Sequence, residues 1–177
     1  MWTKLSLITA LALAAGASAD VINFDDLVGQ GPIQDGYGGV ADWTTGSWQF
    51  YDSFQPPYNP HSGLTRVYCL NPTNEFSFAH DVVLDGAWFS GNGEANGFPP
   101  ISWSLYYQGN LVHNSNTLDC TDVPQYMPTG YNGLVDRVVV NGTTDFFVMD
   151  DLTYDVPAPG AVALLGLAGL AAGRRRR

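Results

Sequence analysis

Positive charge is scarce in this sequence of 177 residues. Seven Lys and Arg residues face seventeen Asp and Glu residues, and five of the seven lie near the chain ends, as Lys4 and a terminal run of four arginines. Between residues 20 and 155 only Arg66 and Arg137 remain, so this stretch has a formal charge of −15. Such a surface repels nucleic acid and anionic lipid headgroups, and we expect no nucleic-acid partner.

Motifs of the common enzyme classes are missing as well. The sequence has no Gly-x-Ser-x-Gly nucleophile motif and no phosphate-binding loop, and its three histidines lack the spacing of a zinc site. With seventeen acids, some pair of carboxylates would match the separation used by glycosidases by chance. We therefore expect a non-enzymatic protein without catalytic residues, and keep a hydrolase as a third alternative.

The N-terminal segment has the features of a secretory signal. Residues 1–19 contain Lys4, an apolar run from Leu5 to Ala15, and the small-residue pattern Ala17-Ser18-Ala19. This layout is typical of a signal peptide, with a signal helix and cleavage between Ala19 and Asp20. We expect export of the chain, with the export machinery and signal peptidase as partners.

The C-terminal apolar run is too short to cross a membrane as an ordinary helix. Ala161 to Gly173 is 13 residues, which gives a helix of roughly 20 Å against a hydrocarbon core of roughly 30 Å. A cluster of arginines directly after an apolar run holds its end on the cytoplasmic side of a membrane. We expect a short hydrophobic helix that engages the membrane as a transmembrane-like segment during export.

Two short motifs flank that segment. They consist of Val156, Pro157, Ala158, Pro159 and Gly160 before it, and of Arg174, Arg175, Arg176 and Arg177 after it. The tail formed by residues 156–177 resembles the PEP-CTERM sorting domain of Gram-negative bacteria, whose motif has Glu where this chain has Ala158. The resemblance implies recognition and processing by an exosortase, and delivery to the cell surface or extracellular matrix.

The body between the two ends, residues 20–155, is expected to be all-β. Short alternating apolar runs are separated by Gly, Pro, Asn and Asp clusters, and no window has a sustained helical period. The expected strands are 21–24, 48–51, 65–70, 75–79, 82–90, a hairpin over 101–115, 134–142 and 145–154. This pattern predicts one domain folded as an antiparallel β-sandwich.

The body also resembles the jelly-roll-like sandwiches of secreted PEP-CTERM proteins, which are similar to galactose-binding and carbohydrate-binding modules. The segments that carry this resemblance are "INFDDL", "YNPHSG", "GAWFSG" and "VDRVVV" followed by "FFVMDDLTY". It implies that a carbohydrate-binding module for extracellular polysaccharide is the alternative to a surface or matrix protein without a sugar ligand.

The chain has only two cysteines, Cys69 and Cys120. In an exported protein an even pair favours one disulfide, which would close a loop of about 50 residues and stabilise the fold by up to roughly 4 kcal/mol. The alternative is two separate buried thiols.

Two pairs of adjacent acids stand near the ends of the body. Asp25 and Asp26 stand at the end of the first expected strand, and Asp150 and Asp151 lie between the last two short strands. First and last strands of a sandwich are often neighbours, so the two pairs could converge on one Ca²⁺, which prefers oxygen ligands. The alternative is that these acids face solvent or accept turn hydrogen bonds.

Aromatic residues are plentiful, at 13% of the chain. Flat rings stack on sugar faces, so a carbohydrate-facing patch could draw on them, but large aromatics also close the core of a sandwich. The candidates are Trp43, Trp48, Tyr51, Phe54, Tyr58, Tyr106, Tyr107, Tyr126 and Tyr131.

Overall fold

The computed structural model describes residues 19–44, 47–92 and 99–157, and this part of the chain is almost entirely β-structure. The expected all-β class is therefore confirmed, and every strand pair is antiparallel. In chain order the elements are β1 (Ala19–Ile22), β2 (Gln30–Pro32), the 3-10 turn η1 (Tyr37–Gly39), β3 (Val40–Asp42), β4 (Trp48–Tyr51), β5 (Arg66–Cys69), β6 (Thr73–Gly91), β7 (Pro100–Tyr107), β8 (Asn110–Asn114), β9 (Leu118–Asp119), β10 (Gln125–Pro128), β11 (Val135–Gly142) and β12 (Phe147–Asp155).

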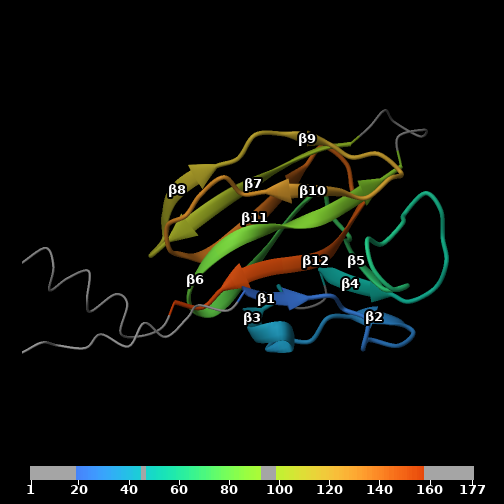
Figure 1. Cartoon of the computed structure of the whole chain (residues 1–177), viewed down its shortest axis with the longest axis horizontal. Coiled ribbons are helices and arrows are strands. Elements are labelled where there is room, and N and C mark those ends of the chain that lie inside the picture. The colour runs from blue at the N-terminus through green and yellow to red at the C-terminus, as the bar shows by residue number, and fades with distance from the viewer. Residues whose placement is uncertain (1–18, 45–46, 93–98, 158–177) are drawn as a thin grey trace, which may run out of the picture. The chain divides into compact units, whose positions relative to one another are not determined.

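The described strands are joined into one continuous antiparallel sheet, which divides into two sheets at the long strand β6 that they share (Figure 1). The first sheet has the order β2-β4-β5-β12-β6, with β1 paired to β12 and β10 paired to β6. The second sheet has the order β6-β11-β7-β8, with β3 paired to β6 and β9 paired to β7. The body that they form, Ser18–Val156, is one compact unit.

Strand β6 replaces two separate strands that the sequence predicts. It runs for 19 residues without a break. Its buried apolar side chains keep one phase from Phe76 to Leu84 and take the other phase at Ala87 and Phe89. The expected gap around His80 is instead an exposed stretch of continuous strand. There β11 shifts its register on β6 between Val82 and Ser77, so the strand leaves one sheet and enters the other.

The hairpin predicted over residues 101–115 is confirmed by β7 and β8. Tyr107 pairs with Asn110, which leaves a loop of Gln108 and Gly109, with φ of 49° and 77°. A two-residue loop with both φ values positive matches the right-handed twist of the strands, and glycine adopts this conformation without a steric penalty.

The hydrophobic core lies between the two sheets and is mostly aromatic. Trp48 of β4 meets Phe76 of β6 with ring centroids 6.1 Å apart, and Phe89 of β6 meets Trp103 of β7 at 5.2 Å. Each of these four side chains is at most 1% exposed. Because the contacts join residues of one sheet to residues of the other, the body is a β-sandwich, as expected.

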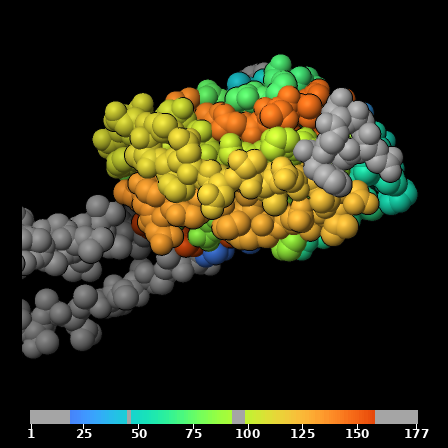
Figure 2. Space-filling model, turned by 90° about the horizontal axis from the view of Figure 1, so that it is seen from above, coloured from blue at the N-terminus to red at the C-terminus, as the bar shows by residue number. Residues whose placement is uncertain are grey.

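Four short strands have no counterpart among the expected ones. β2, β3, β9 and β10 are two to four residues long. They are too short for an alternating pattern to stand out, and they form because a longer neighbour supplies the hydrogen-bond partners. Residues of the β8–β10 region, coloured yellow to light orange, occupy much of the near face in Figure 2.

The expected signal helix and C-terminal hydrophobic helix lie outside the described residues. Within residues 19–44, 47–92 and 99–157 no helix is long and apolar enough to cross a membrane.

Candidate functional site

The outer face of the first sheet is unusually rich in tyrosine and polar side chains. Along β4 and β5 the side chains alternate, so that Trp48 and Val67 enter the core, while Tyr51, Arg66 and Tyr68 take the other side. Tyr51 pairs with Arg66 across the two strands, and Tyr68 pairs with Val148 of β12. The strand pairings therefore place these residues side by side on one face.

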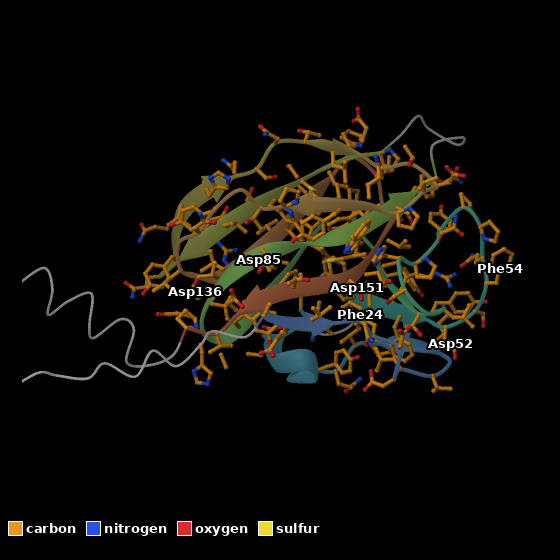
Figure 3. All side chains as sticks on the ribbon, viewed as in Figure 1. Phe24, Asp52, Phe54, Asp85, Asp136 and Asp151 are labelled. Atoms are coloured by element: carbon orange, nitrogen blue, oxygen red, sulfur yellow. The ribbon has the colours of Figure 1, made fainter. Side chains whose placement is uncertain are left out.

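The 52–65 loop, which joins β4 to β5, lies over part of this face. The Asn59 carbonyl accepts a hydrogen bond from the Ser90 hydroxyl at 2.6 Å, and the Asn59 amide donates to the Asp122 carbonyl at 2.7 Å. Figure 3 shows Asp52 and Phe54 at one end of the body, with Asp85 and Asp136 at the other. Phe54, at the outer side of the loop, is 78% exposed.

Between the 52–65 loop and the sheet is a pocket of about 360 Å³, which we call the tyrosine pocket. Its floor comes from β4, β5 and β12, and the loop supplies one wall. The lining residues are Gln30, Tyr51, Gln55, Tyr58, Arg66, Tyr68, Cys69, Leu70, Asp145, Phe147 and Val148.

Three tyrosines give the pocket flat ring surfaces as well as hydroxyl groups. Tyr51, Tyr58 and Tyr68 are all partly buried, so their rings are supported by neighbours and still reachable. The side-chain amide of Gln30, on the edge strand β2, donates to the Tyr68 hydroxyl at 2.8 Å and holds the tip of that ring. Rings with polar tips, held in place, can stack on an apolar ring face and bond its substituents.

Arg66 is the basic group of the pocket and is only 1% exposed. Its guanidinium lies 4.6 Å from the centroid of the Tyr51 ring and donates to the carbonyls of Ser53 and Leu64. Nη2 also donates to Gln55 Oε1 at 3.0 Å. Burial lowers the pKa of Arg66, while the charge of Asp52 opposes that shift.

A second group of polar residues attaches the other half of the 52–65 loop. His61 Nδ1 lies 2.6 Å from Asp151 Oδ2, and the His61 ring stacks on Trp88 with centroids 3.5 Å apart. The Ser62 N–H donates to Asp150 Oδ2 at 2.8 Å. We call His61, Ser62, Trp88, Asp150 and Asp151 the His61 cluster.

Asp150 is the most perturbed group of the His61 cluster. Asp150 is 2% exposed, and burial raises its pKa to about 7. The hydrogen bond from Ser62 lowers the pKa in part, and the negative charge of Asp151 raises it further. The Ser62 hydroxyl donates to Asp151 at 3.1 Å rather than to His61. The three residue types of a hydrolytic triad are therefore present, but their hydrogen bonds do not form the serine–histidine–aspartate relay.

The calcium site expected at Asp25, Asp26, Asp150 and Asp151 is not formed. Among residues 19–44, 47–92 and 99–157, no three His, Cys, Asp or Glu side chains come together in a way that could hold a metal ion. Asp26 accepts a hydrogen bond from the Tyr37 hydroxyl at 2.5 Å, and Asp25 packs so closely on Gly63 that a Cβ there would lie 1.8 Å from Asp25 Oδ1. The 61–63 segment thus contacts each acid pair through different residues. Gly63 packs on Asp25, whereas His61 and Ser62 bond to Asp150 and Asp151.

The disulfide expected between Cys69 and Cys120 is also absent, because both cysteines are free and buried. Cys69 belongs to β5, whereas Cys120 packs on Gly91 of β6, where an added Cβ would lie 3.0 Å from its own. Strand β12 lies between β5 and β6. Two strand spacings are about 10 Å, more than a disulfide can bridge. The second alternative, two separate buried thiols, matches the structure.

The aromatic candidates divide between core and surface. Trp43 and Trp48 are fully buried in the core, as the competing interpretation has it, whereas Tyr51 and Tyr58 line the tyrosine pocket. The remaining tyrosines lie away from that pocket: Tyr106 beneath Arg137, Tyr107 bonded to Asp81, Tyr126 beside Trp88, and Tyr131 stacked on His113.

The predicted sorting residues fall largely outside the described part of the chain. Of the motif at 156–160 only Val156 and Pro157 are described, and they follow β12. Of the expected signal-cleavage site, Ala19 and Asp20 are the first residues of β1.

Several pocket residues were not identified from the sequence, among them Gln30, Gln55, Tyr68 and Asp145. For Tyr68 a signal existed, because in "RVYC" it stands two residues after Arg66 and therefore on the same face of a strand. The other three come from a short strand and two loops, where no periodicity marks the side that faces the pocket.

Comparisons with known proteins add little to this geometry. No protein-family model matches the sequence, and no curated protein sequence matches it. Among solved structures, TmCBM61 in complex with β-1,4-galactotriose aligns with 63% of this chain and 83% of its own, at 13% identity and a TM-score of 0.40. A similarity of that size carries no argument about the fold or the ligand of this chain.

Proposed function

We propose that this chain is an exported surface or matrix protein whose β-sandwich body binds a carbohydrate in the tyrosine pocket. The observation that carries the proposal is the composition of the pocket, in which three tyrosines stand beside amide, guanidinium and carboxylate groups. Sugar rings offer apolar faces for stacking and hydroxyl groups that both donate and accept hydrogen bonds. A pocket of about 360 Å³ is also within the usual size of a small-ligand site.

The proposal is of binding rather than catalysis. Asp145 is the only carboxylate among the residues that line the pocket, so the pair of carboxylates that most glycosidases require is not assembled there. A finer assignment of the sandwich to the jelly-roll or galactose-binding type belongs to the same proposal, and the resemblance of four sequence segments supports it.

Binding is tested by screening the purified protein on an array of polysaccharides and oligosaccharides. Tyr51→Ala and Tyr68→Ala should each weaken binding to the best ligand about tenfold, because each removes a stacking surface worth roughly 1–2 kcal/mol. Tyr106→Ala is the matched control, because Tyr106 also lies beneath an arginine but outside the pocket. Equal losses in all three variants, or no binding to any glycan, would contradict the proposal.

We further propose that residues 156–177 act as a sorting signal read by an exosortase in a Gram-negative host, as the resemblance to the PEP-CTERM tail implies. The support is the order of a proline motif, a short apolar segment and four arginines. Fusing this tail to a secreted reporter should lead to processing in an exosortase-positive host, and replacing the four arginines by Ser should abolish it. A reporter secreted unprocessed in both forms would refute this assignment.

A further inference from the structure

The body contains two arginines, and their surroundings differ in one respect that points to a ligand. Both guanidinium groups lie over a tyrosine ring, Arg66 over Tyr51 at 4.6 Å and Arg137 over Tyr106 at 3.8 Å. Arg137 is also paired with a carboxylate, because its Nη1 lies 2.7 Å from Glu75 Oε2. Arg66 has no such partner among the residues that the structure describes.

The unpaired arginine is the more buried of the two. Arg66 is 1% exposed, whereas the side chain of Arg137 is 36% exposed. A buried charge is costly unless it is paired and hydrogen-bonded, so the arginine that most needs a counter-charge is the one without it. Asp52, the acid whose charge is felt at Arg66, bonds instead to the Gly29 N–H at 2.7 Å.

Neutral acceptors take up some of the hydrogen-bond donors of the Arg66 guanidinium. Three contacts occupy Nη1 and one hydrogen of Nη2, at Ser53, Leu64 and Gln55. A guanidinium has five N–H donors, so Nε–H and the second Nη2 hydrogen have no partner among the described residues. Since Arg66 lines the tyrosine pocket, these are the donors available to a molecule bound there.

We propose that the tyrosine pocket binds a sugar that carries a carboxylate, as in the uronic acid residues of an acidic polysaccharide, and that this carboxylate pairs with the Arg66 guanidinium. The inference rests on the proposed carbohydrate-binding function and names its ligand class. The guanidinium matches a carboxylate in planar, bidentate fashion, and the tyrosine rings would hold the pyranose beside it.

The negative charge of the body opposes an anionic ligand but does not exclude it. Most of that charge is on exposed acids, and it is screened over a Debye length of about 8 Å at physiological salt. The acid of the pocket itself is Asp145, which is exposed. Asp145 therefore has opposite expected effects on the two kinds of ligand. Its negative charge weakens the binding of a uronate, whereas its acceptor oxygens strengthen the binding of a neutral sugar.

The test compares charged and neutral forms of the same sugars. Binding of the purified full-length chain to trisaccharides of galacturonate, glucuronate and mannuronate is measured by calorimetry, and each is measured again after its carboxyl groups are reduced to alcohols. At least one uronate should bind about ten- to a hundredfold more tightly than its reduced form, the range expected for a charge-assisted hydrogen bond.

Variants then assign the preference to Arg66. Arg66→Lys, which keeps the charge and loses the planar fork, should remove most of the preference, and Arg137→Lys, the matched control, should retain it. Asp145→Asn, a change at an exposed residue, should strengthen uronate binding while leaving the reduced sugars unchanged or weaker. This variant and the comparison of sugars in the native chain decide the matter even if Arg66→Lys does not fold.

Each outcome separates this inference from the function on which it rests. Reduced trisaccharides that bind as tightly as the uronates would overturn the inference and leave the carbohydrate-binding function standing. A preference that survives Arg66→Lys, or uronate binding that Asp145→Asn weakens, would overturn the assignment to this guanidinium. Absence of binding to both forms, with no glycan bound on the array, would refute the function itself.

Discussion

Replacing Asp150 by Asn should remove much of the pH dependence of the protein's stability. Asp150 is 2% exposed, and its carboxylate accepts hydrogen bonds from the N–H groups of Ser62 and Asp151 at 2.8 Å each. Burial outweighs these bonds and, with the charge of Asp151, raises the pKa of Asp150 from 3.8 to about 7. Asp151, the neighbouring acid, is bonded to His61.

The direction in which stability changes with pH depends on whether the folded or the unfolded state holds the proton of Asp150. Between pH 4 and pH 7 the folded protein keeps Asp150 protonated while the unfolded chain has released that proton, so stability falls as pH rises through this range. A difference of about 3 pH units, at about 1.4 kcal/mol per unit, gives up to about 4 kcal/mol. This contribution is fully present below about pH 4 and is lost as the pH rises through about 7.

The assay is urea unfolding at several values of pH between 4 and 8. The native chain should lose up to about 4 kcal/mol of unfolding free energy across this range through Asp150, and Asp150→Asn should lose correspondingly less. The Asn side chain has one oxygen where the carboxyl group has two, so one of the two N–H groups loses its acceptor and the variant should also be about 1–3 kcal/mol less stable at low pH. The informative quantity is therefore the slope of its unfolding free energy against pH, and not its stability at one pH.

Asp122→Asn removes one charge at an exposed position and serves as the control for a change in net charge alone. Its slope should match that of the native chain. If Asp150→Asn also kept the native slope, the carboxyl group at position 150 would not be the source of the pH dependence, and its assignment as a proton-holding buried acid would be wrong.

Two further predictions concern the core. Cys69 and Cys120, whose pKa values burial raises to about 12, should resist alkylation in the folded protein and react fully after unfolding; a disulfide-linked peptide found by mass spectrometry would contradict this. Trp48→Ala should cost about 3–5 kcal/mol because the side chain is fully buried, whereas Phe54→Ala, at a site 78% exposed, should stay within about 0.5 kcal/mol. Equal denaturation midpoints for these two variants would refute the assigned core.

Several strands were predictable because short runs of apolar and aromatic residues are bounded by Gly, Pro, Asn and Asp. "WQFY" is the strand Trp48–Tyr51, and the hairpin over 101–115 was marked by its Gln-Gly-Asn turn. The junction in β6 could not be read in this way, because exposed residues at 79–81 look like a turn in the sequence. They are exposed because the strand passes there from one sheet to the other, a property of the tertiary fold rather than of the local sequence.

The candidate site was predictable only in part, for a related reason. Tyr51 and Tyr58 were named as sugar-facing candidates and do line the pocket, but Trp43 and Trp48, named with them, are core residues. Residue type does not separate these two groups, and only the face of a strand does. The disulfide prediction was wrong because sequence separation says nothing about the strand that lies between two cysteines.

The pocket exists because the 52–65 loop is attached at both of its halves by residues outside the loop. Arg66 holds the first half through Ser53 and Gln55, and the His61 cluster holds the second half through contacts that span 88 to 90 residues. The pocket wall formed by Gln55 and Tyr58 lies between these two attachments.

Arg66 therefore has two roles at one position: it attaches the loop through neutral acceptors and presents its remaining donors to the pocket. A neutral side chain could fulfil the first role by hydrogen bonding, without the cost of burying a charge. The charge itself suits the second, proposed role, because a guanidinium can bind an anion in a planar, bidentate way. The same two attachments hold the Arg66 donors in a fixed position relative to the tyrosine rings, so a bound carboxylate would meet a preorganised partner.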